Sequence, residues 1–199
     1  MMSILPSEEQ LLLREAARSF LAERYPMSWV RAWTEAEEEE RRELHQRLWA
    51  DLAEMGWLGL LWPEEVGGSA QTFVEQAIVL EELGRALIPS PYLATLLAAA
   101  IVDRATEGEM RRSILTDVCA GRLSMAPAVF EEAGEDLSVC ETRVRSVEGQ
   151  TVLSGRKAFV ADASLVDALL VAAEDTEKGR AWFLVDAAAE GVRLSLIHI

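Results

Sequence analysis

The sequence predicts an α+β fold in which an N-terminal all-α helical bundle, residues 1–121, precedes a partial β-sandwich or barrel-like middle domain, residues 122–199. Before residue 121, apolar residues recur every three or four positions, as on the buried face of a helix. After residue 121 they alternate, as in strands with one buried face. Half of the 199 residues are hydrophobic, which supplies enough apolar surface for a sizeable core.

The chain is strongly acidic, with 19 basic and 34 acidic residues and a formal net charge of -15. This charge repels a phosphate backbone, so general nucleic-acid binding is not expected. The first ten residues lack the basic and apolar regions of a secretory signal, and a cytoplasmic protein is therefore expected. The most apolar stretch, residues 93–102, is too short to cross a bilayer and is predicted to be a buried helix.

Five helices are predicted, and the first two have clear boundaries. Ser7 and Gln10 form a capping box for the first, and Pro26 prevents its continuation. The second runs through the acidic block at residues 37–40 and ends at Gly56. Glutamates and arginines four apart in this block predict a solvated helix face. The apolar stripe of the second helix is Leu44, Leu48, Leu52 and Met55.

The next three helices are separated by Gly and Pro. Thr72 and Glu75 form the capping box of the third, which ends near Gly84. Pro91 is suited to the first turn of the fourth, and the fifth covers residues 109–120 before Gly121. Their predicted buried faces are Phe73, Ala77 and Leu80; Leu93, Leu96, Leu97, Ala100 and Ile101; and Met110, Ile114, Leu115 and Val118.

The β-rich part is predicted from alternation and turn residues. Strands are expected at residues 142–147, 151–155, 168–173 and 181–185, with a turn at Gly149-Gln150, a polar loop at residues 174–180 and a further strand at residues 192–196. A β-domain that ended there would have an unpaired hydrophobic edge. Residues 197–199 are therefore expected to be a truncation point or a foreign tail.

Residues 55–68, MGWLGLLWPEEVGG, are the most specific motif of the chain, followed by EELGR at residues 81–85. Gly56 suits a helix stop, Pro63 fixes a turn, and the Gly67-Gly68 pair permits backbone angles that other residues resist. Both elements resemble the N-terminal helical domain of the acyl-CoA dehydrogenase family. The resemblance implies two of that family's three domains, with the C-terminal helical domain absent.

The β-rich part continues the resemblance. In the family, this part begins with a T-E-P-x-x-G-S-D loop and continues through a Thr to an L-x-G-x-K-x-W-I-T-N segment, and the loop and the segment line the flavin. The corresponding residues here are residues 130–136, Thr142 and residues 153–162. The resemblance thus implies FAD contacts at Val129, Phe130, Phe159, Val160 and Ala161. Hydroxyls of the family are replaced at Val129 or Phe130 and at Ala161, and each lost hydrogen bond costs about 0.5–1.5 kcal/mol.

Two expectations about this region remain open. Phe159 could form an aromatic wall for the flavin, or Phe159 and Val160 could be core residues of a buried strand. The resemblance also places Gly134 and Glu135 along the acyl-CoA path, where the charge of Glu135 would repel phosphates. The nearest basic side chains are predicted to face solvent. They are Arg143, Arg145, Arg156 and Lys157.

Other chemistry has little support in the sequence. Cys119 and Cys140 fit neither a metal site nor a disulfide framework and are predicted to be ordinary buried thiols. His45 is predicted to be a surface or half-buried residue without a catalytic role, and no metal site is expected. The paired acids at residues 64–65 and 81–82 could act as bases but lie in a turn and at a helix end.

The resemblance implies an FAD-dependent acyl-CoA dehydrogenase of fatty acid metabolism, which oxidises an acyl-CoA thioester to the 2,3-enoyl-CoA. Its implied partners are an electron-transfer flavoprotein and other subunits of a homo- or hetero-oligomer. The catalytic base of the family lies in the C-terminal domain, so the 199 residues alone are expected to be inactive. Two alternatives stay open: a non-catalytic partner subunit of a heteromeric dehydrogenase, and a flavin monooxygenase or oxidase on the same fold.

Overall fold

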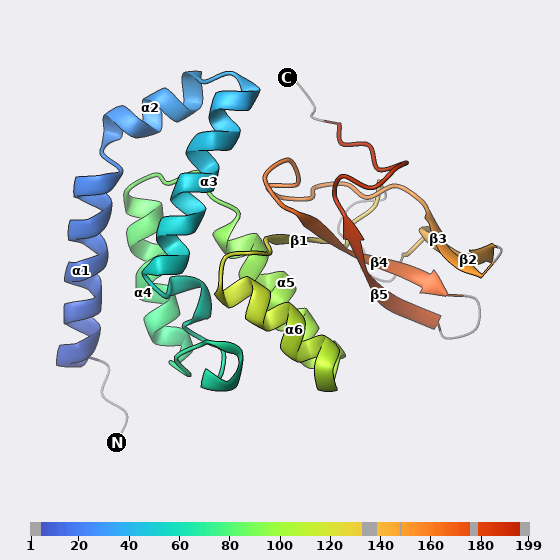
Figure 1. Ribbon diagram of the computed structural model, residues 1–199, viewed down its shortest axis with the longest axis horizontal. Coiled ribbons are helices and arrows are strands. Elements are labelled where there is room, and N and C mark those ends of the chain that lie inside the picture. The colour runs from blue at the N-terminus through green and yellow to red at the C-terminus, as the bar shows by residue number, and fades with distance from the viewer. Residues whose placement is uncertain (1–4, 133–138, 148, 176–178, 196–199) are drawn as a thin grey trace. The chain divides into compact units, whose positions relative to one another are not determined.

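The computed structural model describes residues 5–132, 139–147, 149–175 and 179–195 (Figure 1). Within these ranges it has six α-helices, two short 3-10 helices and five strands, which confirms the predicted α+β class. The chain forms two compact units. The first extends to Ser90 and includes Leu115–Arg122, and the second contains Pro91–Ile114 and the chain from Leu123 onward.

The first unit is a helical bundle of α1 (Glu8–Arg24), α2 (Met27–Glu35), α3 (Glu38–Glu54) and α4 (Phe73–Arg85). Helix α1 packs against α4, and α2 crosses between the ends of α1 and α3 (Figure 1). The capping boxes predicted at Ser7 and Thr72 are both present. The acidic block at residues 37–40 is exposed, as predicted.

Several helical predictions were wrong in detail. Helix α2 was not predicted; Pro26, which ends α1, is the N-cap residue of α2. Phe73 is 68% exposed. The buried face of α4 is instead Gln76, Ile78, Val79, Glu82 and Leu83. On the later helices, Leu93, Leu97 and Met110 are also exposed. The spacing of apolar residues fits burial of more than one face of a helix, and the packing partners decide which face is buried.

The motif at residues 55–68 folds as two 3-10 turns, η1 (Trp57–Gly59) and η2 (Glu64–Val66). Gly56 and Gly67 have φ of 71° and 86°, the left-handed region in which glycine is favoured. Trp57 and Trp62 are buried, so they belong to the core of the unit. Main-chain hydrogen bonds from Ser69 N to Gly59 O (3.1 Å) and from Ala70 N to Trp62 O (2.8 Å) close the loop on itself.

The second unit combines a mixed sheet with α5 (Tyr92–Ala105) and the first part of α6 (Gly108–Cys119). Helix α5 packs on β1 (Met125–Ala128), and the buried Thr95 Oγ1 donates to Met125 O at 3.1 Å. This packing places α5 with the sheet, whereas the predicted domains place it with the bundle. The domain limits 1–121 and 122–199 stay a prediction.

The sheet is built around β4 (Ala168–Asp175), whose first six residues are buried. β5 (Gly179–Asp186) pairs antiparallel with the whole of β4. On the other edge of β4, β1 pairs in parallel with residues 168–171 and β2 (Arg143–Val147) with residues 174–175. β3 (Gln150–Ser154) forms an antiparallel hairpin with β2. β1 and β2 therefore share one edge of β4.

The strand predictions were confirmed except at two places. β1 was not predicted, because four residues with Pro127 in their midst give no alternating pattern. Residues 192–195 contain no strand, so that prediction was wrong for them, and Leu196 lies outside the described residues. The expected 174–180 loop is also shorter, because β4 extends to Asp175 and β5 begins at Gly179.

Candidate functional site

The two segments that the resemblance assigns to the flavin lie side by side in the second unit. Ala158 N donates a hydrogen bond to Phe130 O at 2.9 Å. Lys157 Nζ donates to Val129 O at 3.1 Å. These bonds join residues 129–130 to the segment that carries Phe159, which was predicted to share a site with them. The assignment of Val129, Phe130, Phe159, Val160 and Ala161 to a cofactor stays a prediction.

Phe159 is the most unusual residue of this pair of segments. Its side chain is 77% exposed, and its φ is 54°, in the left-handed region. For a residue other than glycine this conformation costs about 1–2 kcal/mol. Such strain concentrates at functional sites, where surrounding structure maintains it. The alternative that Phe159 is a core residue of a buried strand was therefore wrong.

The neighbours of Phe159 anchor the segment. Val160 is half-buried and packs against the apolar core that includes Ala126 and Val171. Ala161 is exposed. The surface thus presents an aromatic ring and main-chain groups, but no hydroxyl at residues 129, 130 or 161. These residues fit a flat aromatic ligand through stacking and main-chain contacts.

A buried carboxylate holds these segments together. The side chain of Glu131 is 6% exposed and forms an ion pair with Lys157, at 2.7 Å between Oε1 and Nζ. Thr142 donates to Oε1 from both its amide (3.0 Å) and its hydroxyl (2.7 Å). Glu141 N donates to Oε2 at 2.5 Å. Both carboxylate oxygens are therefore hydrogen-bonded, as a buried charge requires.

The hydrogen bonds to Glu131 set its protonation state. Burial would raise the pKa of this carboxyl, but hydrogen bonds from Lys157, Thr142 and main-chain amides outweigh burial and lower the pKa to about 2. Glu131 is therefore ionised at neutral pH and has no proton to donate as a general acid, and its low pKa and hydrogen-bonded oxygens make it a weak proton acceptor. Its role is to position residues 129–132 against residues 155–161.

The contacts around Glu131 give structural roles to Thr142, Gly155 and Lys157 of the β-rich motifs. Lys157 is buried beside Glu131, so the prediction that it faces solvent was wrong. Gly155 passes so close to Thr142 that a Cβ on it would lie 2.6 Å from Thr142 Cα and 2.7 Å from Thr142 Cβ. Gly155, at the end of the strand predicted at residues 151–155, could have indicated this contact, because a Gly in a strand often marks a close approach of another main chain.

We expect Gly155→Ala to lower the free energy of unfolding by about 1–3 kcal/mol, because the new methyl group overlaps main-chain atoms of Thr142. Urea denaturation measures the change. Ser154→Ala, at the preceding exposed position, is the control and should change stability by less than about 0.5 kcal/mol. Equal stability of the Gly155→Ala variant and the unsubstituted chain would contradict the close approach.

We expect Phe159→Gly to leave the chain as stable as before or to stabilise it by up to about 1.5 kcal/mol. Glycine removes the left-handed strain, which costs about 1–2 kcal/mol, but adds about 0.5–1 kcal/mol of unfolded-state entropy. The exposed ring contributes little burial. Phe159→Ala keeps the strain and is the matched control, so it should show no gain. A loss above 1 kcal/mol for Phe159→Gly in urea denaturation would speak against strain.

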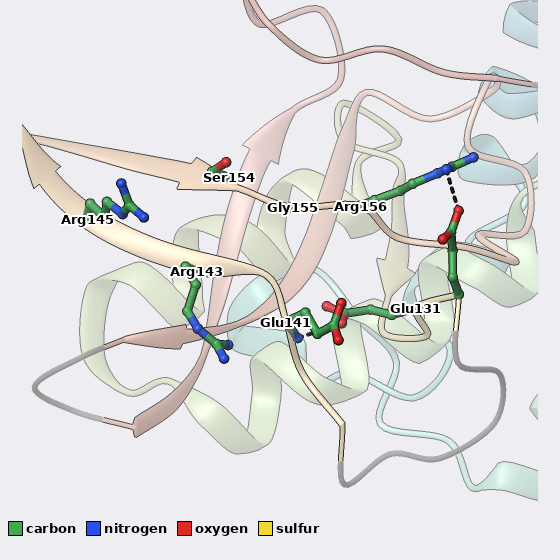
Figure 2. Close-up of a pocket in the computed structure, with 8 residues that line it drawn as sticks. Glu131, Glu141, Arg143, Arg145, Ser154, Gly155 and Arg156 are labelled. Carbon is green, nitrogen blue, oxygen red and sulfur yellow. Dashed lines mark hydrogen bonds and ion pairs between the residues drawn. The ribbon is translucent and has the colours of Figure 1, made fainter.

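A pocket of about 360 Å³ lies next to the Glu131 cluster (Figure 2). Arg143, Arg145 and Arg156 are exposed there, as predicted. The lining residues are Glu131, Glu132, Glu141, Arg143, Arg145, Ser154, Gly155 and Arg156. Gly134 and Glu135, predicted to line the acyl-CoA path, lie outside the described residues. Their assignment to substrate stays a prediction.

Two further candidate residues, Glu82 and His45, are buried in the helical unit. Glu82 is buried, and Arg18 binds it with 2.7 Å between Nη2 and Oε1. The hydrogen bond from Arg18 lowers the pKa of Glu82 despite burial. His45 is buried beside Trp49, so its prediction as a surface or half-buried residue was wrong.

The cysteines and the other potential metal ligands of the described residues form no cluster. Cys119 and Cys140 are buried free thiols, as predicted, and burial raises the pKa of Cys119 to about 11. Across residues 5–132, 139–147, 149–175 and 179–195, no group of three or more His, Cys, Asp or Glu could hold a metal ion. The helices in these ranges include none with the length and hydropathy to cross a bilayer.

Comparison with known families gives a match over most of the helical part of the chain. The family model for the acyl-CoA dehydrogenase N-terminal domain matches residues 7–122. These residues include the motif at residues 55–68 and all six α-helices.

Three known proteins show how far the similarity extends. The acyl-CoA dehydrogenase FadE12 of Mycobacterium tuberculosis is 28% identical over 99% of this chain and 51% of its own length. The caffeyl-CoA reductase-Etf complex subunit CarC of Acetobacterium woodii is 28% identical over 94% and 50%. The ChsE4-ChsE5 complex from Mycobacterium tuberculosis superimposes with a TM-score of 0.80 at 27% identity, over 98% and 52%. The chain thus spans about half the length of the proteins it matches.

Proposed function

The chain belongs to the acyl-CoA dehydrogenase family, and we propose that the complete protein is an FAD-dependent enzyme that oxidises an acyl-CoA thioester to the 2,3-enoyl-CoA. The observation that carries this proposal is the exposed, strained Phe159 beside Val129 and Phe130. FAD is the cofactor of the family. Its flat ring matches an aromatic wall with main-chain groups around it.

The protein's own contribution is to hold the flavin and to orient it. Phe159 would stack on the flavin ring, and main-chain groups at residues 129–130 and 160–161 would contact its edge. The ion pair between Glu131 and Lys157 fixes the relative position of the two segments. FAD, when bound, supplies the two-electron redox chemistry that no side chain offers. No residue of the chain is proposed as the base, which in the family lies in the C-terminal domain.

The proposed partners follow from the relatives. CarC is named as a subunit of a complex with Etf, and ChsE4 and ChsE5 form a complex of two proteins. These names support an electron-transfer flavoprotein as electron acceptor and an assembly with identical or related subunits. An acyl-CoA substrate also accords with the names of FadE12 and CarC.

A non-catalytic partner subunit of a heteromeric dehydrogenase is the second candidate. The absence of hydroxyls at Val129, Phe130 and Ala161 favours it, since a flavin site without them loses hydrogen bonds. The exposed Phe159 favours the first candidate, because a strained exposed ring has no packing role to maintain it. The two candidates differ in whether the protein reacts with a substrate by itself.

Anaerobic titration of the complete protein, reconstituted with FAD, separates these candidates. Acyl-CoA thioesters of short, medium and long chains are added in turn. The proposal expects at least one to bleach the flavin absorption band and to yield one equivalent of enoyl-CoA. A protein that takes up FAD but is not reduced by any thioester would contradict it. A protein that takes up no FAD would support the partner subunit.

A further inference from the structure

We propose that the face of the β2–β3 hairpin carrying Arg143, Arg145 and Ser154 binds the phosphate groups of a nucleotide. The three side chains line one pocket of about 360 Å³ (Figure 2). This site uses side chains of β2 and β3, whereas the residues assigned to the flavin are Val129, Phe130 and residues 159–161.

Strand geometry places the three side chains together. Arg143 and Arg145 are two residues apart on β2 and therefore point to the same face, opposite to the buried Val144. Ser154 is the direct cross-strand partner of Arg143. Side chains of such a pair have Cβ atoms about 4.5–5.5 Å apart, within reach of one small anion.

The charges of the pocket leave a positive excess. Arg156 forms an ion pair with Glu132, and Glu131 with Lys157, so these four charges cancel. Arg143 donates to the main-chain oxygen of Cys140, which is neutral. Within the described part of the chain Arg145 makes no ion pair or side-chain hydrogen bond. Two guanidinium groups thus face the single carboxylate of Glu141.

A local positive excess is notable in a chain with a net charge of -15. The overall charge repels a long polyanion such as nucleic acid, whereas a small phosphorylated ligand senses mainly the local groups. Arginine presents a planar fork of donors that matches phosphate oxygens, and a serine hydroxyl adds a further donor. The volume of about 360 Å³ suits one or two phosphate groups.

The source of the phosphate is a separate question. The proposed acyl-CoA substrate has a phosphorylated nucleotide at one end, and the identification of the ligand as that nucleotide rests on the proposed function. Free inorganic phosphate offers the same chemistry. The two sources differ in affinity, because a nucleotide brings further contacts from its sugar and base.

Isothermal titration calorimetry of the 199-residue chain at low salt tests the site, with 3′,5′-adenosine diphosphate and inorganic phosphate as separate probes. We expect Arg143→Gln and Arg145→Gln each to weaken nucleotide binding about 10-fold, since each removes a charge-assisted contact. Arg31→Gln, at an exposed arginine of α2, is the control and should bind as the unsubstituted chain does. Added salt should also weaken binding.

The outcomes separate the claims. Unchanged affinity in Arg145→Gln, or an equal loss in Arg31→Gln, would overturn the site. Equal affinity for both probes would retain the anion site but overturn its assignment to a nucleotide. Neither probe requires FAD, so flavin uptake by the complete protein without nucleotide binding here contradicts only this inference. Arg145-dependent nucleotide binding in a protein that takes up no FAD contradicts only the proposed dehydrogenase.

Discussion

Lys157→Met is expected to lower the free energy of unfolding by about 3–5 kcal/mol, because it leaves the carboxylate of Glu131 buried without its countercharge. The two side chains are 8% and 6% exposed and lie 2.7 Å apart. Methionine is unbranched and one atom shorter than lysine but fills nearly the same volume, so the packing changes little. Urea denaturation at pH 7 measures the loss.

The matched controls separate the buried pair from an ordinary one. Arg156→Met, at the exposed pair with Glu132, should cost less than about 1 kcal/mol. The double variant with Glu131→Gln and Lys157→Met removes both charges and should be more stable than Lys157→Met alone. A cost of Lys157→Met equal to that of Arg156→Met would refute the structural role of the pair.

The carboxyl of Glu131 should also make the free energy of unfolding depend on pH. Its pKa of about 2 lies below its ordinary value of 4.5. A group with a depressed folded-state pKa stabilises the protein fully above its unfolded pKa, and this contribution, about 3 kcal/mol, is lost as the pH falls from about 4.5 to about 2. Glu131→Gln lacks this contribution, so its stability should fall less between pH 5 and pH 2.5. Parallel declines in both proteins would show that Glu131 is not the group responsible.

Gly68→Ala is expected to destabilise the helical unit by about 3 kcal/mol or more, at or above the upper end of the usual cost of overpacking. A Cβ at this position would overlap the main-chain oxygen of Trp62 and lie 2.5 Å from its carbonyl carbon and 2.7 Å from Gly59 O. Main-chain atoms cannot rotate away as a side chain can. Urea denaturation followed by tryptophan fluorescence reports the loss, because Trp57 and Trp62 belong to this loop.

Gly84→Ala is the control for this substitution. A Cβ on Gly84, within α4, would have no atom within 4 Å. Alanine at an exposed helical position is favoured over glycine by about 1 kcal/mol, so this variant should be more stable than the unsubstituted chain. If both variants changed stability in the same direction, the close approach at Gly68 would not be the cause of the first effect.

Local signals in the sequence predicted the helical unit well. Ser7 and Thr72 supply their own capping partners three residues later, and Gly56 ends α3 in a left-handed conformation. Such features depend on atoms within a few residues, so the sequence contains all that determines them. The pair of β2 and β3 was predictable for the same reason, since Gly149 turns the chain between them.

Features set by distant residues were missed. Which face of α4 is buried depends on α1, whose Arg18 binds Glu82 far along the chain. β1 has only four residues and becomes a strand because β4 pairs with it. The exposure of Phe159 could not be predicted either, because hydrogen bonds from its neighbours to residues 129–130 determine the path of that segment.

Phe159 and the adjacent residues 129–130 are proposed to form one wall of a flavin site. The dissociation constant of FAD from the complete protein, measured for the unsubstituted form and for Phe159→Gly, tests it most directly, with Phe73→Ala on α4 as the exposed-aromatic control. We expect FAD to bind, Phe159→Gly to weaken binding about 10-fold through lost stacking, and Phe73→Ala to leave it unchanged. A folded protein that binds no FAD, or equal affinity in all three forms, would contradict the claim.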